Sequence, residues 1–92
     1  MSEEYIPQIY MVAPAGGKKV DCYFTNGSVK RYDVGRAIRL GGVFEPLKSQ
    51  RVFEKSLTVV DGVLSFDIAG ARDPYNMVDI CADVVYAEGV PV

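Results

Sequence analysis

Residues 19–33 read K-V-D-C-Y-F-T-N-G-S-V-K-R-Y-D and carry the strongest structural signal in the chain. At their centre, Asn26-Gly27 separates two arms in which apolar and polar residues alternate. An Asn-Gly pair between such arms is typical of a β-hairpin tip, because both residues accept the positive φ angles of a type I′ turn. With a two-residue loop, Tyr23 faces Lys30 across the hairpin. A three-residue loop would shift the register and exchange the faces of one arm.

The two faces of this hairpin follow from the alternation of side chains along a strand. With the two-residue loop, the face that we expect to be buried holds Val20, Cys22, Phe24, Val29 and, as its polar exception, Arg31. The other face carries Tyr23, Lys30 and Tyr32. Tyrosine is enriched at protein interfaces, so this second face is a candidate interaction surface. The alternative is ordinary packing beneath the C-terminal segment of the same chain.

Other segments predict more strands. Residues 8–12 carry apolar side chains on both faces, which is typical of an inner strand. Residues 57–66 repeat the hairpin pattern with Asp61-Gly62 at the tip. One face of this second hairpin holds Leu57, Val59, Leu64 and Phe66. Residues 77–80 predict one further short strand, and residues 68–75 predict a loop.

Short helices are expected between these strands. The spacing of apolar residues over 34–40, after Asp33 as N-cap, predicts a helix of about two turns. Ser49 is placed to cap a second helix over residues 50–55. Residues 82–86 predict a last helical turn.

Length and composition limit the fold to one domain. The chain has 92 residues and 49% hydrophobic content, which is enough for a single core. The predicted fold class is α+β over residues 1–92, with residues 1–7 frayed. We expect one antiparallel sheet of about five strands, built from two hairpins and an added strand, with short helices packed on one face.

The N-terminal sequence M-S-E-E-Y is acidic where a signal peptide is basic, and no apolar run reaches the ~18 residues of a membrane span. A cytoplasmic location and no membrane partner are therefore expected. In such a compartment cysteines are reduced, which favours free thiols over a disulfide between Cys22 and Cys81.

Basic residues concentrate in one part of the chain. The net charge is -2, but residues 18–39 contain six basic residues against two acidic ones, namely Lys18, Lys19, Lys30, Arg31, Arg36 and Arg39 against Asp21 and Asp33. A solvated surface is the ordinary interpretation of such a segment. The alternative is a nucleic-acid interface that uses the whole basic segment from Lys18 to Arg39.

The sequence offers few groups for catalysis. It contains no histidine, which removes the commonest general base, and it has no C-x-x-C, Walker or G-x-G-x-x-G motif. No enzymatic activity and no cofactor are predicted. The acidic group of Asp73, Asp79 and Asp83 lacks the spacing of an EF-hand, so no metal site is predicted. Cys81 precedes a predicted helical turn and is a candidate reactive thiol, because helix N-termini favour thiolate; the alternative is a buried, inert thiol.

Three blocks of sequence resemble a known family. F-T-N-G-S-V-K-R-Y-D-V, G-V-F-E-P-L-K-S-Q-R-V-F-E-K-S-L-T-V and N-M-V-D-I-C-A-D-V-V-Y are similar, in this order, to motifs of the bacterial domain-of-unknown-function family numbered 2442. Those motifs are F-x-N-G-x-x-R-x-F-D, V-F-x-x-L-x-x-x-x-x-F and N-G-x-D-[IL]-x-P-[DE]-x-L-Y. The chain departs from them at Arg31, Met77, Cys81 and Ala82, and residues 68–75 resemble an insertion.

The resemblance implies a small α+β protein without an established activity, encoded beside another small protein in the manner of toxin and antitoxin pairs. The predicted function is thus a non-enzymatic interaction module, antitoxin-like, whose partner is another small protein or a second copy of the chain. The candidate interaction residues are Tyr23, Lys30, Tyr32, Arg36 and Arg39. The alternative function is a nucleic-acid-associated regulator that uses the basic segment.

Overall fold

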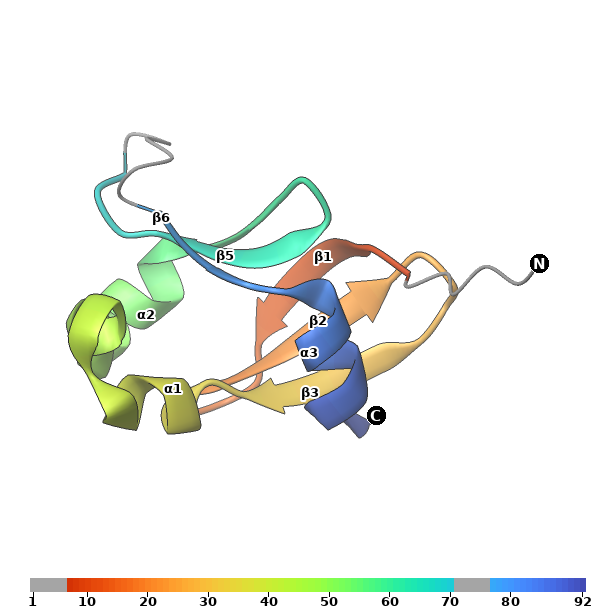
Figure 1. Ribbon diagram of the computed structural model, residues 1–92, viewed down its shortest axis with the longest axis horizontal. Coiled ribbons are helices and arrows are strands. Elements are labelled where there is room, and N and C mark those ends of the chain that lie inside the picture. Colours follow the sequence, from red (N-terminus) through yellow and green to blue (C-terminus); the bar gives the residue numbers. More distant parts are fainter. Residues whose placement is uncertain (1–6, 71–76) are drawn as a thin grey trace.

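The computed structural model describes residues 7–70 and 77–92, which form two antiparallel sheets and short helices (Figure 1). The first sheet has the strand order β1-β2-β3-β7 and consists of β1 (Ile9–Pro14), β2 (Lys19–Phe24), β3 (Val29–Asp33) and β7 (Val90–Pro91). The second sheet has the order β4-β5-β6 and consists of β4 (Leu57–Val60), β5 (Val63–Asp67) and β6 (Met77–Ile80). The predicted α+β class is confirmed.

Three of the helices gather at one end of the molecule, and the last one lies beside β3 (Figure 1). They are α1 (Gly35–Leu40), the 3-10 helix η1 (Gly42–Lys48), α2 (Gln50–Ser56) and α3 (Ala82–Glu88). The predicted cap of α2 is confirmed, because the Ser49 side chain accepts a hydrogen bond from the Val52 amide. The N-cap of α1 is Val34, so the prediction of Asp33 at this position is wrong by one residue. The Asp33 carboxylate still accepts a hydrogen bond from the Gly35 amide at 2.8 Å. Within the described residues, no helix is long and apolar enough to cross a membrane.

The prediction of one sheet of about five strands is wrong. Each hairpin belongs to its own sheet, and the Ile9 amide donates to the Gly62 carbonyl at 3.0 Å where β1 passes the tip of the second hairpin. The helices do not share one face either, since α2 contacts β5 while α3 contacts β3. A twisted hairpin with one apolar face can bury it against a second such hairpin, and this arrangement replaces a continuous sheet.

The first hairpin has the three-residue loop, not the two-residue loop on which the face assignment was based. The Phe24 amide donates to the Ser28 carbonyl at 2.8 Å, and Tyr23 pairs with Val29. Gly27 has a φ of 90° at the position where a type I turn ends in a left-handed residue. The β3 side chains are therefore exchanged between the two faces, and Tyr32 points into the core.

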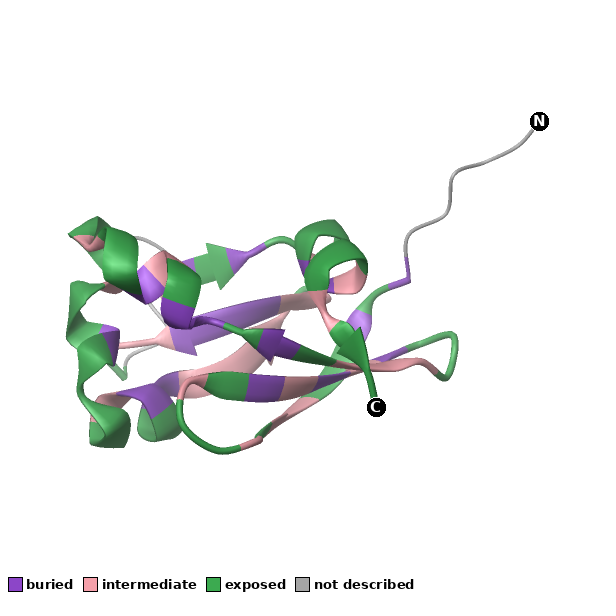
Figure 2. Cartoon of the chain, turned by 90° about the horizontal axis from the view of Figure 1, so that it is seen from below, coloured by how far each residue is buried: buried purple, intermediate pink, exposed green. Residues whose placement is uncertain are grey.

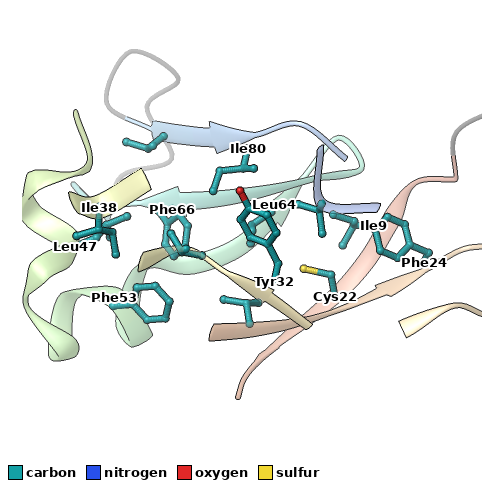
Figure 3. Close-up of a cluster of buried hydrophobic side chains, with 14 residues drawn as sticks. Ile9, Cys22, Phe24, Tyr32, Ile38, Leu47, Phe53, Leu64, Phe66 and Ile80 are labelled. Atoms are coloured by element: carbon teal, nitrogen blue, oxygen red, sulfur yellow. The ribbon is translucent and has the colours of Figure 1, made fainter. Parts of the chain in front are cut away.

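The core lies between the two sheets and contains residues of both hairpins (Figure 3). Tyr32 and Cys22 lie in this cluster with Phe24, and Tyr32 is only 9% exposed. The cluster of buried hydrophobic residues consists of Ile9, Val20, Cys22, Phe24, Tyr32, Val34, Ile38, Leu47, Phe53, Leu64, Phe66, Val78, Ile80 and Val85. Along β2 and β6, buried residues alternate with more exposed ones (Figure 2).

The second hairpin agrees with its prediction. Asp61 and Gly62 have φ angles of 51° and 81°, as a two-residue type I′ turn requires, and Val60 pairs with Val63. Its predicted face, with Leu64 and Phe66 fully buried, is the core face. The strand over residues 77–80 and the last helix are also confirmed, whereas η1 and β7 were not predicted. Of the predicted loop, residues 71–76 lie outside the described residues, as do residues 1–6 of the predicted frayed terminus.

Candidate interaction surface

The first sheet has a face directed away from the core, which we call the outer face. Strand register places its side chains in two rows that cross all four strands. The first row consists of Ala13, Asp21, Arg31 and Val90. We call it the charged row because its two central residues are charged. The apolar row consists of Met11, Tyr23, Val29 and Val92, the last two joined by a bond from the Val92 amide to the Val29 carbonyl at 3.0 Å. Lys19 and Asp33 pair beyond the charged row.

The apolar row is accessible. Met11 is 45% exposed and Val92 is 69% exposed, while Tyr23 and Val29 are partly exposed. A β-bulge beside Met11 brings the exposed Tyr10 ring to 6.4 Å from the Tyr23 ring. These residues thus form a contiguous apolar strip across the sheet.

An ion pair lies next to this strip. The Arg31 guanidinium donates through Nε to Asp21 Oδ1 at 2.8 Å and through a second nitrogen to Asp21 Oδ2 at 3.0 Å. These hydrogen bonds lower the pKa of the Asp21 carboxyl below its usual value, chiefly because they favour the charged form. Such bidentate geometry holds both side chains flat on the outer face and fixes the position of each charge.

The predicted surface is only partly assembled. Tyr23 lies in the apolar row, but Tyr32 is buried, so the prediction that both tyrosines share an exposed face is wrong. Lys30 also lies on the core side, where its Nζ is 4.8 Å from the centre of the Tyr86 ring in α3. The cause is the longer loop, which exchanges the faces of β3 but not those of β2.

The basic residues are dispersed. Arg36 and Arg39 are exposed on α1, beyond the end of the sheet (Figure 1). The Lys18 side chain is turned toward α2, donating to Gln50 at 2.8 Å and lying 5.2 Å from the Phe53 ring centre. With Arg31 bound to Asp21 and Lys30 over Tyr86, these cations do not form one face.

The signal that sequence reasoning missed was present in β1. Apolar side chains on both sides of residues 8–12 were interpreted as an inner strand, but β1 is an edge strand of the four-stranded sheet. Tyr10 and Met11 are exposed on the outer face. An edge strand with two apolar faces indicates a second surface to be covered. For Val90 and Val92, the sequence offers no comparable pattern.

The two cysteines have opposite environments. Cys22 is fully buried, and burial raises the pKa of its thiol to about 12. Cys81 is exposed immediately before α3, and both cysteines are free. A disulfide between them is absent.

We expect a thiol reagent to modify one cysteine in the native protein and two after unfolding. Cys81 is accessible, whereas Cys22 is shielded from the reagent and kept as unreactive thiol. Mass spectrometry of the alkylated protein, native and in denaturant, measures this, and Cys81→Ser should leave the native protein unmodified. Two cysteines labelled at equal native rates would contradict the burial of Cys22. Labelling of Cys81 no faster than that of an unstructured peptide would refute its special reactivity.

The cavity beside α2 and the acidic residues support a functional site less strongly than the outer face does. An open cavity of about 730 Å³ lies between α2 and residues 67–70 and is lined in part by Arg51, Lys55 and Asp67. Within the described ranges, no group of three or more His, Cys, Asp and Glu residues is placed to hold a metal ion. Asp73, one member of the acidic group seen in the sequence, lies outside those ranges.

Comparison with known proteins adds no assignment. No family model, no curated protein and no solved structure matches this chain.

Proposed function

We propose that this domain is a non-enzymatic protein-interaction module that binds its partner through the outer face of the four-stranded sheet. The observation that carries the proposal is the apolar row, a strip of exposed Met, Tyr and Val side chains on a sheet whose other face is already buried in the core. Exposed apolar residues scattered singly need no explanation, but a contiguous strip on a rigid element is typical of a binding surface.

The composition of the face supports this function. Tyrosine, methionine and arginine are enriched at protein interfaces, where large side chains supply contact area. Tyr10, Tyr23, Met11 and Arg31 all lie on the outer face. The ion pair satisfies the charges of Asp21 and Arg31 within the chain, so covering this region costs less than burying two unpaired charges.

Membership of family 2442, and with it an antitoxin-like role in a two-gene pair, remains part of the proposal and rests on the three sequence blocks. The alternative of a nucleic-acid-associated regulator receives less support, because Lys18, Lys30 and Arg31 are turned to intramolecular contacts. Binding through the remaining cations would fall steeply with salt, which distinguishes it from an apolar interface.

Substituting Met11→Asp is expected to abolish partner binding, because it places an unpaired charge in the apolar row, which is desolvated on binding. The matched control is Leu40→Asp, which makes the same kind of change at a residue that is 87% exposed on α1, away from the outer face. Each immobilised protein is used for capture from native cell extract at low and high salt, after circular dichroism has shown that both variants are folded.

A protein partner retained at high salt by the wild type and by Leu40→Asp, but lost by Met11→Asp, supports the proposal. Equal retention by Met11→Asp would exclude the outer face as the binding surface. Nucleic acid that is captured at low salt and released at high salt would favour the regulator instead.

A further inference from the structure

Building on the proposed function, we infer that the outer face binds a second copy of this chain, and that the two-fold axis runs parallel to the strands between β2 and β3. These are the two central strands in the order β1-β2-β3-β7. Stacking two sheets about this axis places β2 over β3 of the second copy and β1 over β7. Within each row, every residue then meets the residue that mirrors its position.

The charged row is complementary to itself under this rotation. Asp21 and Arg31 are cross-strand partners on β2 and β3, so each carboxylate lies over the guanidinium of the second copy. Lys19 and Asp33 are also cross-strand partners, and they exchange in the same way. Opposite charges therefore meet at each of these positions. The four charges sum to zero, so the face does not favour a strongly charged partner of either sign.

The apolar row is complementary as well. Tyr23 pairs with Val29 across the central strands, so the rotation places each tyrosine over a valine of the second copy. Met11 and Val92 lie at the two ends of the same row and meet each other. Apolar side chains are thus buried against apolar side chains along the row, which an isologous two-fold interface requires.

Other two-fold axes do not give this match. An axis across the strands, through the charged row, brings Asp21 against Asp21 and Arg31 against Arg31. An axis across the strands through the apolar row places the Asp21–Arg31 pair of each copy over the tip of the first hairpin of the other copy. Only the axis parallel to the strands pairs charge with opposite charge and apolar with apolar.

The size of the face sets the expected affinity. Four strands spaced by about 4.8 Å, over a length of roughly 17 Å, give a face smaller than the ~800 Å² that each partner contributes to a standard interface. A weak dimer is therefore expected, with a dissociation constant on the order of tens of micromolar or higher. The mass in solution should rise from monomer to dimer over the micromolar concentration range.

The test reverses the polarity of the ion pair without removing it. In the double variant Asp21→Arg with Arg31→Asp, the two charges still pair within the chain, so the fold is preserved. Two copies of the double variant still place opposite charges against each other. A mixed dimer of variant and wild type, however, places Arg over Arg and Asp over Asp.

Sedimentation equilibrium is expected to give the double variant nearly the wild-type dimerisation constant. Native mass spectrometry of isotope-labelled wild type mixed with the double variant should show mixed dimers weakened by about tenfold or more, because like charges are brought together. As a control, Met11→Asp should be monomeric while Leu40→Asp dimerises like the wild type.

A wild type that stays monomeric through the micromolar range, or mixed dimers in the statistical proportion, would overturn the two-fold arrangement. The proposed function fails separately. Suppose that the wild type is monomeric but captures a different protein that Met11→Asp no longer retains. The outer face is then a binding surface, and only the identity of the partner is wrong. If Met11→Asp retains every protein that the wild type captures, the outer face is not a binding surface.

Discussion

The substitution Tyr32→Ala is expected to lower the free energy of unfolding by about 3–5 kcal/mol, as is usual for removing a buried aromatic ring. The ring lies in the core between the sheets beside Cys22 (Figure 3), so it packs against other side chains of this chain and does not form part of the exposed surface. Because a domain of this size has roughly 5–14 kcal/mol of total stability, the variant should be close to unfolding. Urea denaturation followed by circular dichroism measures the change.

Tyr23→Ala is the matched control, because it removes the same side chain from the neighbouring strand on the outer face. The expected loss is within about 1 kcal/mol, as for a partly exposed residue without a core contact. Equal losses for the two variants would contradict the three-residue loop and would support the register in which both tyrosines share a face.

Alkaline pH is expected to destabilise the protein through Cys22. The unfolded thiol ionises at 9.0, whereas burial raises the pKa of the folded thiol to about 12. The folded state therefore retains a proton that the unfolded state loses, and stability falls by up to about 1.4 kcal/mol for each pH unit in this window. Below pH 9.0 the contribution is fully present, so the stability should show no dependence on this group.

The control is Cys22→Ala, which has no ionisable group and a slightly smaller side chain. Urea denaturation at a series of pH values should show the fall beginning near 9.0 for the wild type and beginning later for the variant. A later fall remains because burial also raises the pKa of Tyr32, so this residue destabilises the fold at higher pH by the same mechanism. Identical pH profiles for the two proteins would show that Cys22 is not desolvated in the folded state.

Local chemistry was sufficient to predict most elements of the fold. Asp61-Gly62 can take positive φ at both positions, and Ser49 can cap a helix, whatever the rest of the chain does. The first hairpin is different, because Asn26-Gly27 fits the two-residue and the three-residue loop. The choice depends on the core. The shorter loop would bury Arg31 and expose Tyr32, and burying a charge without a partner costs far more than closing a longer loop.

The candidate surface was less accessible to sequence reasoning. Tyr23 was predicted, but its neighbours in the apolar row come from β1 and from the segment around β7, which are far apart in the sequence. Val90–Pro91 is too short a strand to show any periodicity, and its position is set by the contact of α3 with β3.

The tip of the first hairpin has an unusual status among surface loops. Loops generally tolerate insertions and deletions, since they seldom determine how a core is filled. Here, deleting one residue from positions 25–27 would shift the register of β3 by one residue. Its side chains would then exchange faces, so that Arg31 would point into the core and Tyr32 would point outward. The number of residues in this tip therefore cannot change without rebuilding both sides of the sheet.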